Sequence, residues 1–326
     1  MARIALFFSA LALVVIQAAP SARAQEFPSK QAIRIIVPFL PGAANDTLAR
    51  ITAAALTPRL GQSVIVENKS GAGSAIGTDF VAKAPPDGYT LLWGGADGIS
   101  VLPAVKPNLP YKVPDDFTFI GQASETVFAV VVSSQLPIKS VPELIAYAKA
   151  NPGKIRYGTS GVGSIAHVGF VLLENRAGIQ MVHVPYKGMS AVVTDLLGGY
   201  IEMAYVTPQT INAHADSDKI RIIATTGSRR APLFPKLPTL KESGLPDVVV
   251  ETWFGVLAPP NLPANVAARL EKEIGDVLKD PEVIAKLKAV SFEPHFLPSE
   301  PFRKYVVDDL NKWKSVAQRE NIVITD

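Results

Sequence analysis

The chain has 326 residues, contains no cysteine and carries a formal net charge of +3 at pH 7. The lack of cysteine excludes disulfides, thiolate catalysis, thiolate-ligated metals and a lipid-anchored cysteine. So weak a charge argues against nucleic acid or an anionic membrane as the partner, and any affinity for an anion has to be built locally by loops.

The N-terminal segment has the three parts of a secretory signal peptide. Arg3 precedes an apolar run over residues 4–16, and a stretch of small residues ends at Ala24. The pattern predicts a signal peptide over residues 1–24, cleaved after Ala24, and a mature chain in the periplasm. Its loss removes Arg3 and Arg23 and no acid, which takes the charge from +3 to +1. The apolar run is too short for a good membrane span, and no later segment qualifies as one.

The mature chain opens with a strand, a tight turn and a helix. Residues 33–37 form a short apolar, β-branched run, which prolines and Gly42 end. The small side chains of residues 42–44 leave the backbone open to a ligand, and Asn45 or Asp46 is expected to cap the following helix. The free N–H groups and positive dipole end of that helix suit an anion. An ordinary βα turn is the alternative for a single loop of this kind.

Short apolar strands and helices alternate along the rest of the chain, which is typical of an α/β protein with mostly parallel sheets. Further strands are expected at 63–67, 89–93, 118–122, 127–132, 155–159, 181–185, 201–206, 221–226 and 248–257. Helices are expected at 74–84, 141–150 with Ser140 as cap, 165–177, 190–197, 209–215, 264–279, 281–290 and 301–320. Residues 101–117 are expected to be irregular, and 127–132 is long and apolar enough to cross between lobes. The apolar stripe of the last helix predicts a face that docks on a sheet.

Five strand-to-helix loops are rich in Gly, Ser and Ala: 39–46, 68–74, 94–100, 160–164 and 186–190. In an open α/β sheet, the carboxyl ends of the strands meet at one edge, where ligands bind. Such loops would line a cleft with backbone donors and hydroxyls, and a few charge-assisted hydrogen bonds suffice to bind a small carboxylate. The recurrence of the loops favours a binding site over a set of ordinary turns.

Motifs for catalysis, metals and nucleotides are weak in this sequence. Ser164 and His167 lie three residues apart on one predicted helix face, which leaves a serine hydrolase as an alternative, although a triad also needs a group that orients the base and an oxyanion hole. The four histidines are scattered without a close pair, so neither a metal site nor another cofactor is expected. His183, between two valines, is interpreted as a hydrogen-bonded core residue. The segment 71–77 does not fit G-x-G-x-x-G, so a nucleotide is not expected either.

A series of segments carries a family resemblance. The early ones are Pro38-Phe-Leu-Pro-Gly-Ala-Ala-Asn-Asp46, Val66-Glu-Asn-Lys-Ser-Gly-Ala-Gly73 and Pro86-Asp-Gly-Tyr-Thr-Leu-Leu92. The later ones are Glu143-Leu144, Asn151-Pro-Gly153, Tyr157-Gly158, Ser160-Gly-Val-Gly-Ser164, Pro185-Tyr-Lys-Gly188, Pro238-Thr239 and Trp253-Phe-Gly255. In order and over nearly the whole mature chain, these segments resemble the Bug-type extracytoplasmic substrate-binding proteins of tripartite tricarboxylate transporters.

The resemblance implies two α/β lobes of the periplasmic binding protein type II fold, joined by two crossing hinge strands and closing on a carboxylate-bearing solute. Lobe 1 is expected to comprise residues 25–125 and 252–326, and lobe 2 residues 126–251, with hinges at 125–127 and 251–253. In such proteins, backbone groups of the first two loops of lobe 1 hold the carboxylate, partly through ordered waters.

The resemblance and the loop pattern predict ligand-binding residues in both lobes. In lobe 1 they are Phe39, Gly42, Ala43, Ala44, Asp46, Gly71, Ala72, Gly73, Ala96 and Asp97. In lobe 2 they are Ser160, Gly161, Gly163, Ser164, His167, Tyr186, Lys187, Gly188 and Thr207. Two departures from the family lie close to the expected ligand: Ala43 stands where a second Gly is usual, and Val206-Thr207 where an acid is frequent. A ligand with an ammonium group is therefore disfavoured.

The resemblance implies a periplasmic receptor that passes a small organic carboxylate to a membrane permease and has no enzymatic activity. The carboxylate and the permease are the expected partners of a monomeric protein, with no cofactor, metal or nucleic acid. A sensor subunit that binds its solute in the same way, but serves a signalling partner, is the alternative to a transport receptor.

Overall fold

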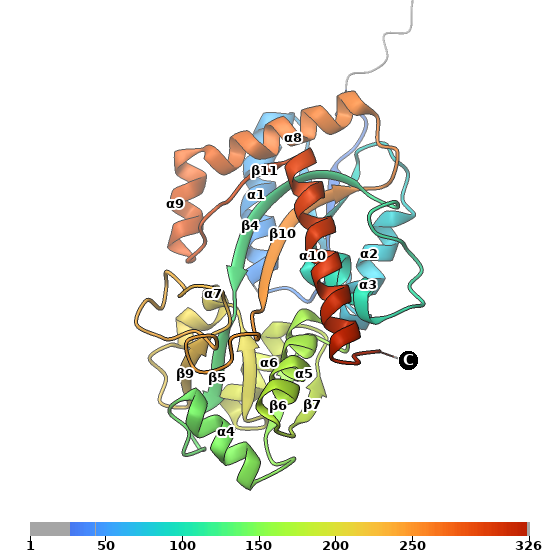
Figure 1. Cartoon of the computed structure of the whole chain (residues 1–326). Coiled ribbons are helices and arrows are strands. Elements are labelled where there is room, and N and C mark those ends of the chain that lie inside the picture. The colour runs from blue at the N-terminus through green and yellow to red at the C-terminus, as the bar shows by residue number, and fades with distance from the viewer. Residues whose placement is uncertain (1–26, 43, 325–326) are drawn as a thin grey trace, which may run out of the picture.

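The computed structural model describes residues 27–42 and 44–324. Their strands form one sheet of six strands and one of five. In Figure 1 the six-stranded sheet and its helices form the upper lobe, and the five-stranded sheet with its helices forms the lower lobe. The predicted signal peptide, its cleavage site and Ala43 lie outside the described residues.

The sheet of the upper lobe has the strand order β11-β4-β10-β3-β1-β2. Its strands are β1 (Ile33–Val37), β2 (Val64–Asn68), β3 (Thr90–Gly95), β4 (Thr118–Val127), β10 (Glu251–Ala258) and β11 (Leu297–Pro298). The helices of this lobe are α1 (Ala44–Leu60), η1 (Ala72–Ser74), α2 (Ala75–Ala82), η2 (Asp97–Val101), α3 (Leu102–Val105), α8 (Ala264–Lys279), α9 (Pro281–Ala289) and α10 (Ser299–Arg319). The upper lobe is thus built from two separate stretches of chain, one before β5 and one after β9.

The sheet of the lower lobe has the strand order β7-β6-β8-β5-β9. Its strands are β5 (Ala129–Ser133), β6 (Arg156–Thr159), β7 (Val182–Pro185), β8 (Met203–Val206) and β9 (Ile220–Thr225). Its helices are α4 (Val141–Ala150), α5 (Ile165–Ala177), α6 (Met189–Gly198), α7 (Pro208–Ile211) and η3 (Asn212–His214). β6, β7 and β8 are each followed by a helix, as the alternation in the sequence predicted.

Both sheets are mixed, which corrects the expectation of mostly parallel sheets. Parallel pairing joins β1 to β2 and β3, and β6 to β7 and β8. β10 pairs antiparallel with β3 and β4, β4 with β11, and β5 with β8 and β9. Strands that leave one lobe or return from the other run against their neighbours. An apolar run in the sequence does not reveal the direction of its strand.

The chain passes between the lobes at two places. β4 runs unbroken in the upper sheet, and β5 begins in the lower sheet directly after Phe128. The chain returns at Val250, whose N–H donates to the carbonyl oxygen of Thr226 at 2.9 Å just before β10 begins. The long crossing strand is therefore β4, and the segment predicted at 127–132 is divided between the two sheets. The lobe boundaries given above stay a prediction, which this path of the chain supports.

Serine caps account for the start of two helices. α4 and α5 span the predicted residues, and the hydroxyls of Ser140 and Ser164 each accept a hydrogen bond from a backbone N–H three residues further on, at 3.3 Å. The start of α1 differs from the prediction, because the helix already includes Ala44. Asn45 and Asp46 consequently lie inside its first turn rather than at its cap, which frees their side chains for other contacts.

The segment after β3 is more regular than predicted. η2 and α3 continue as helical turns to Val105, and 106–117 forms the irregular part of the stretch expected at 101–117. The buried hydroxyl of Tyr111 donates a hydrogen bond to the carbonyl oxygen of Gly98 at 2.7 Å. This bond fixes η2, which begins with Asp97, against the excursion that follows it.

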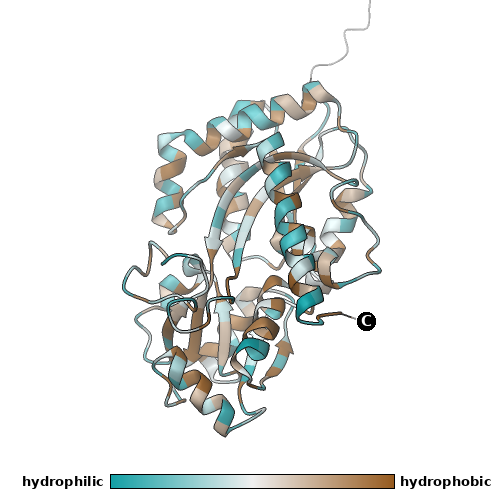
Figure 2. Cartoon of the chain, in the orientation of Figure 1, coloured by the Kyte–Doolittle hydropathy of each residue, from teal (hydrophilic) through white to brown (hydrophobic). Residues whose placement is uncertain are grey.

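Apolar packing fills the space between sheets and helices in both lobes. The inward stripe of α10 is buried at Phe302, Val306, Leu310, Trp313 and Val316, which confirms the predicted docking face. In Figure 2 brown segments occur on the strands of both sheets, β4 and β10 also carry pale and teal segments, and the exposed faces of the surrounding helices carry teal segments. One buried apolar cluster includes residues of both lobes, among them Trp253 and Phe302 above and Tyr157 and Phe170 below. Relative motion of the lobes is expected where the few crossing segments join them.

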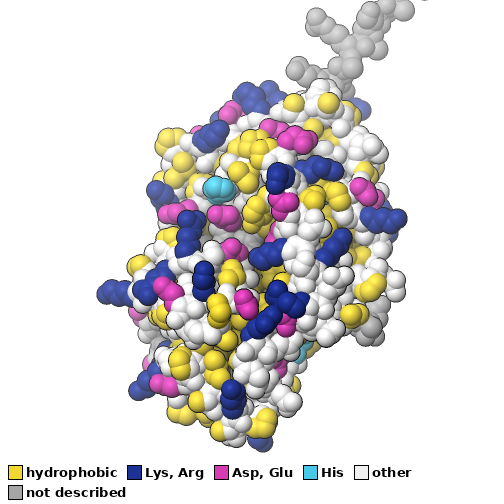
Figure 3. All heavy atoms as spheres, in the orientation of Figure 1, with side chains coloured by type: hydrophobic (Ala, Val, Ile, Leu, Met, Phe, Trp, Pro, Cys, Tyr) yellow, Lys and Arg dark blue, Asp and Glu magenta, His cyan; other side chains and the backbone are white. Residues whose placement is uncertain are grey.

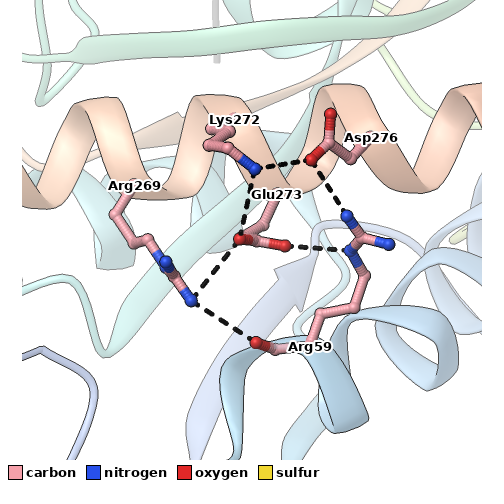
Figure 4. A network of polar contacts seen from close by, with 5 residues as sticks. All are labelled: Arg59, Arg269, Lys272, Glu273 and Asp276. Atoms are coloured by element: carbon pink, nitrogen blue, oxygen red, sulfur yellow. Dashed lines mark hydrogen bonds and ion pairs between the residues drawn. The ribbon is translucent and has the colours of Figure 1, made fainter.

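An ion-pair network fixes the end of α1 against α8 (Figure 4). Arg59 contacts one oxygen of Glu273 and one of Asp276, both at 2.9 Å. Arg269 and Lys272 also contact Glu273, at 3.4 and 3.9 Å. Glu273 is buried, so these cations compensate a carboxylate that has left water. The network anchors α1 at the end opposite to Ala44.

The visible surface mixes charges of both signs. In Figure 3, Lys and Arg side chains are interspersed with Asp and Glu side chains over both lobes of the face shown. This distribution agrees with the small net charge and gives that face no single basic field. Within 27–42 and 44–324, no helix combines the length and the apolar character that a membrane crossing needs.

Candidate functional site

A small cavity lies between the two lobes, with a volume of about 60 Å³. Its lining, in chain order, is Phe39, Ala44, Asn45, Asp97, Phe128, Ser160, Ile165, Ala166, Met189, Thr207, Thr210, Thr252 and Phe254. The volume corresponds to about two water molecules at liquid density. The lobes are therefore nearly closed on each other, and a larger solute fits only when they separate further.

Five of the predicted ligand-binding residues line this cavity: Phe39, Ala44, Asp97, Ser160 and Thr207. The structure places the other described ones outside the lining: Gly42, Asp46, Gly71, Ala72, Gly73, Ala96, Gly161, Gly163, Ser164, His167, Tyr186, Lys187 and Gly188. Most of these belong to loops that contact each other across the lobes or to hydrogen-bond networks beside the cavity.

Two buried polar side chains of the lining have no hydrogen-bond partner. Asn45 is 6% exposed, and both its amide nitrogen and its amide oxygen are unpaired; Thr252 is 2% exposed, and its hydroxyl is unpaired. Buried polar groups are nearly always hydrogen-bonded in native proteins, and an unsatisfied one costs about 1–3 kcal/mol. Asn45 in the first turn of α1 and Thr252 in β10 therefore mark the wall of the cavity where a polar ligand is expected.

A short chain of hydrogen bonds connects the lobes at the edge of the cavity. The N–H of Ala44, in α1, donates to the hydroxyl of Thr210 at 3.2 Å. The hydroxyls of Thr210 and Thr207 lie 3.0 Å apart at the start of α7. The lower lobe thus satisfies one of the free N–H groups at the start of α1, which holds the two lobes together in this closed arrangement.

Asp97 brings the one carboxyl group of the described lining into the cavity and also bridges the lobes. It is 7% exposed, and its Oδ1 accepts a hydrogen bond from the N–H of Ile165, at the start of α5, at 3.0 Å. Burial raises the pKa of the Asp97 carboxyl to about 6, against which backbone hydrogen bonds act. The closed arrangement therefore removes a carboxylate from water and places it on a helix N-terminus of the other lobe.

Two glycine-rich loops, 71–74 and 161–163, meet across the lobes, and we call this contact the glycine seam. A Cβ atom on Gly73 would lie 2.5 Å from the carbonyl oxygen of Val162, and one on Gly161 would lie 3.2 Å from the Cα of Gly73. All four residues of 71–74 have positive φ, from 49° to 136°, although two of them are not glycine. These glycines allow two backbones to approach each other and do not line the cavity.

Asp46 holds the first loop in place instead of facing the cavity. Its carboxylate accepts hydrogen bonds from the N–H of Gly42 at 3.1 Å, from Arg50 at 2.9 Å and from Asn68 at 2.9 Å. Burial acts to raise the pKa of Asp46, but these three donors hold it below its usual value. Asn68 also donates to the carbonyl oxygen of Phe39 at 3.0 Å. The network fixes the loop that carries Phe39 to the cavity.

Ser164 and His167 are arranged for structure and not as a nucleophile and its base. The Ser164 hydroxyl accepts a hydrogen bond from the backbone N–H of His167, while the His167 ring accepts one from the N–H of Gly163 at 3.1 Å. The rings of His167 and His183 stack with centroids 3.9 Å apart, which corrects the expectation that the histidines form no close pair. Burial lowers the pKa of both imidazoles to about 4. His183 bonds the Thr159 hydroxyl at 2.7 Å, as predicted, but it is half-buried on the edge strand β7 and not a core residue.

The loop after β7 contacts the upper lobe beside the cavity. The hydroxyl of Tyr186 donates to Asp195 at 2.7 Å, and Lys187 is exposed. A Cβ atom on Gly188 would lie 3.1 Å from the Cβ of Leu40, so this glycine permits another close approach between the lobes. This loop reaches the cavity through Met189.

An open groove of about 780 Å³ adjoins the cavity. Ala44 and Thr210 line both spaces, and Gly42, Ser190 and His214 are among the other residues of the groove. The hydrogen bond between Ala44 and Thr210 lies on the shared edge. Separation of the lobes at this edge would join the groove to the cavity and admit a solute.

Eight lining residues were not among the individually predicted ligand-binding residues: Asn45, Phe128, Ile165, Ala166, Met189, Thr210, Thr252 and Phe254. The predicted loops 39–46 and 186–190 nevertheless contain two of them, Asn45 and Met189. Asn45 was interpreted as a helix cap. Its polar side chain next to the first glycine-rich loop could also have indicated a ligand-binding residue. Phe128, Thr252 and Phe254 lie in or beside the crossing segments, which the sequence marks as apolar runs. The expected hinge at 251–253 was the available signal for Thr252.

The lining combines apolar walls with neutral hydrogen-bonding groups and one acid. Aromatic rings come from Phe39, Phe128 and Phe254, and hydroxyls from Ser160 and three threonines. Within the described part of the chain, no group of three or more His, Asp or Glu side chains could hold a metal ion. Such a surface can bind a small, partly apolar solute with neutral donors and adjust its fit as the lobes close.

Comparisons with known proteins agree with this geometry. Residues 48–322 match the family described as "Tripartite tricarboxylate transporter family receptor". Protein BugT of Bordetella pertussis is 33% identical over 296 residues, which cover 90% of each chain. Among solved structures, R. palustris Rpa4515 with adipate is 30% identical with a TM-score of 0.86, and covers 91% of this chain and 99% of that one. MatC (Rpa3494) from Rhodopseudomonas palustris with bound malate is 26% identical with a TM-score of 0.82, over 89% and 99% of the two chains. These likenesses confirm the predicted two-lobe periplasmic binding protein fold.

Proposed function

This chain belongs to the tripartite tricarboxylate transporter receptor family, and we propose that it captures a small carboxylate-containing solute in the periplasm and delivers it to a tripartite tricarboxylate-type permease. The family consists of solute-binding receptors and not of enzymes. The observation that carries the proposal is the pair of buried, unpaired polar side chains, Asn45 and Thr252, in a cavity between two lobes. The related structures that hold adipate and malate add that carboxylates bind to this fold.

In this proposal neutral donors bind the solute carboxylate. The amide of Asn45 and the hydroxyls of Thr252 and Ser160 line the same cavity, and the first two are buried. A hydrogen bond to a charged group contributes roughly 1.5–3 kcal/mol, so a few of them suffice for micromolar affinity after the cost of association. The described lining holds no Lys or Arg, which makes the geometry of these donors the main source of selectivity.

Lobe closure is the working motion of the proposed receptor. The bonds from Ala44 to Thr210 and from Ile165 to Asp97 join residues of different lobes, and they form only when the lobes approach. A solute that contacts both lobes adds to these bonds and shifts the population towards the closed form. The permease is expected to recognise that closed form of a monomeric receptor.

The test is calorimetry on the mature chain, residues 25–326, with the carboxylates that raise its melting temperature in a thermal-shift screen. Asn45→Leu keeps the branched shape and the number of side-chain heavy atoms and removes the amide, and we expect it to weaken binding by roughly 10- to 100-fold. Thr52→Val is the matched control, because Thr52 is a buried, unpaired polar residue of the same helix that does not line the cavity. Equal affinities in wild type, Asn45→Leu and Thr52→Val would show that the solute binds elsewhere.

Two further measurements separate the proposal from its rivals. Incubation of the bound carboxylate and of carboxylic esters with the protein is expected to give no product, whereas turnover that Ser164→Ala abolishes would establish a hydrolase. Reconstitution of the chain with a tripartite tricarboxylate-type permease in membrane vesicles is expected to give uptake of the solute that depends on the chain. High-affinity binding without such uptake would favour the sensor subunit.

A further inference from the structure

The cavity holds one acid without a cationic side chain to compensate it. Among the described lining residues Asp97 is the only ionisable one, and the other polar groups are an amide and four hydroxyls. Asp97 is 7% exposed in the closed arrangement. A buried carboxylate is stabilised by hydrogen bonds and by a nearby positive charge, and it is costly without them.

The hydrogen bonds of Asp97 compensate its burial only in part. Oδ1 accepts from the N–H of Ile165 at the start of α5, which belongs to the other lobe. Burial nevertheless raises the pKa of the carboxyl to about 6, so the closed cavity disfavours its charged form relative to water. When the lobes close on an ionised Asp97, the described lining therefore supplies no positive charge to compensate it.

We propose that the solute itself supplies this counter-charge: it is a monocarboxylate that carries a protonated nitrogen, which pairs with the Asp97 carboxylate when the lobes close. The inference rests on the proposed function and names the class of solute. Asn45 and Thr252 hold the carboxylate end, and Asp97 holds the ammonium end. A dicarboxylate would bring a second negative charge next to Asp97, and the described lining holds no cation that compensates either group.

This inference reverses one expectation from the sequence. The segment Val206-Thr207 lacks the acid that is frequent there in the family, which disfavoured a ligand with an ammonium group. In the structure Thr207 lines the cavity together with Asp97, which arrives from the upper lobe. The acid is therefore present in the cavity, although it comes from a different loop and a different lobe.

The experiment compares matched solutes at two chain lengths by calorimetry at pH 8. The probes are 4-aminobutanoate, butanoate and succinate, and the longer series 6-aminohexanoate, hexanoate and adipate, together with the common α-amino acids. We expect an amino acid to bind the wild-type chain at least roughly tenfold more tightly than the monocarboxylate and the dicarboxylate of its length. In Asp97→Asn this preference should fall by roughly tenfold or more, while the dicarboxylate binds as tightly as before or more tightly.

Asp97→Asn retains an oxygen that can accept the Ile165 N–H, and a melting curve checks that the variant folds. Asp308→Asn is the control for the loss of one negative charge, because Asp308 lies on the exposed face of α10 and its side chain is 62% exposed. The inference is overturned if a dicarboxylate or a plain monocarboxylate binds the wild-type chain and no amino acid does. It is also overturned if Asp97→Asn leaves the preference unchanged. Absence of binding by every carboxylate would instead refute the proposed function, and this inference with it.

Discussion

The cavity and the glycine seam join the same two lobes by opposite means. At the seam, backbone meets backbone: Gly73 leaves no room for a Cβ atom, and one on Gly161 would be tightly packed. In the cavity, side chains meet around a space, and Asn45 and Thr252 keep polar atoms unpaired. The small residues at 71–74 and 161–163 therefore mark where the lobes touch. The residues expected to recognise the solute are single polar side chains at the start of α1 and in β10.

The largest effect is expected from a methyl group in the seam. Gly73→Ala places a Cβ atom 2.5 Å from the carbonyl oxygen of Val162, which is too close for contact. The lobes of this variant therefore cannot close fully. We expect the affinity for the solute to fall on the order of 100-fold, and the decrease in radius of gyration on binding to disappear. Calorimetry and small-angle X-ray scattering measure the two quantities.

The control for this substitution is Gly153→Ala. Gly153 also has a positive φ, 71°, but a Cβ there would have no neighbour within 4 Å. It therefore reproduces the backbone strain, which costs roughly 1–2 kcal/mol, without a clash between lobes. If both variants bound the solute equally well, the seam would not control closure.

The next largest effect is expected from Asp46, whose hydrogen bonds hold the loop at residues 39–46 in place. Asp46→Ala removes the acceptor for Arg50, Asn68 and Gly42, and we expect the free energy of unfolding to fall by about 2 kcal/mol. The solute affinity should fall by less than roughly tenfold, because the carboxylate acts through the loop. Urea unfolding and calorimetry test both values.

The control is Asp308→Ala, which breaks an exposed pair with Lys304 and should cost no more than about 0.5 kcal/mol of unfolding free energy. A large loss of affinity without a loss of stability would make Asp46 a direct ligand contact.

Acidification tests the stacked pair His167 and His183, which lies beside the glycine seam. The pKa values of His167 and His183 are lowered to about 4 in the folded chain by burial, so the unfolded chain takes up protons first. Their contribution to stability is fully present above about pH 6.5 and is lost as the pH falls towards 4. We expect a loss of about 2 kcal/mol over this range after allowing for partial exposure.

This pH dependence is best measured by urea unfolding in an Asp97→Asn background. The pKa of Asp97 is raised, so its contribution has the opposite sign and favours the folded state as the pH falls from about 6. With that group removed, adding His183→Asn should reduce the loss on acidification by about half. An unchanged pH profile would contradict the burial of the stacked pair.

The smallest effect is expected at the cap of α5. Ser164→Ala and Ser140→Ala each remove a hydroxyl that accepts a helix N–H at 3.3 Å, and each should cost about 1 kcal/mol of unfolding free energy. Because Ser164 does not line the cavity, the solute affinity should stay equal in both variants. If Ser164→Ala lost solute affinity and Ser140→Ala did not, Ser164 would be a ligand-binding residue, as the sequence predicted.

Much of the fold could be predicted because local chemistry decides it. The cap at Ser140, the bounds of α5 and the apolar stripe of α10 are properties of short segments, and the structure confirms them. The directions of the crossing strands were not predictable in this way, since β4 and β10 pair across a long interval of chain. The stacking of His167 on His183 escaped prediction for the same reason.

The candidate site was predicted at the level of loops and less well at the level of side chains. Phe39, Ala44, Asp97, Ser160 and Thr207 line the cavity, and their contact with a ligand stays a prediction. A glycine-rich loop has the same sequence signature whether its backbone approaches a ligand or another loop. The distinction between the two depends on what lies opposite, which only the packed lobes reveal.

The sequence by itself determined the alternation of strands and helices, because periodicity, caps and turns are read along the chain. The ordered motifs gave the resemblance to the family, and that resemblance implied the two lobes. Only the tertiary structure decided which residues face the cavity. Asp46 is drawn into a network by Asn68, which lies on another strand, while its neighbour Asn45 is left unpaired at the cavity. The physical reason is that side-chain direction and hydrogen-bond satisfaction depend on partners distant in sequence, and adjacent residues of one helical turn point to different surroundings.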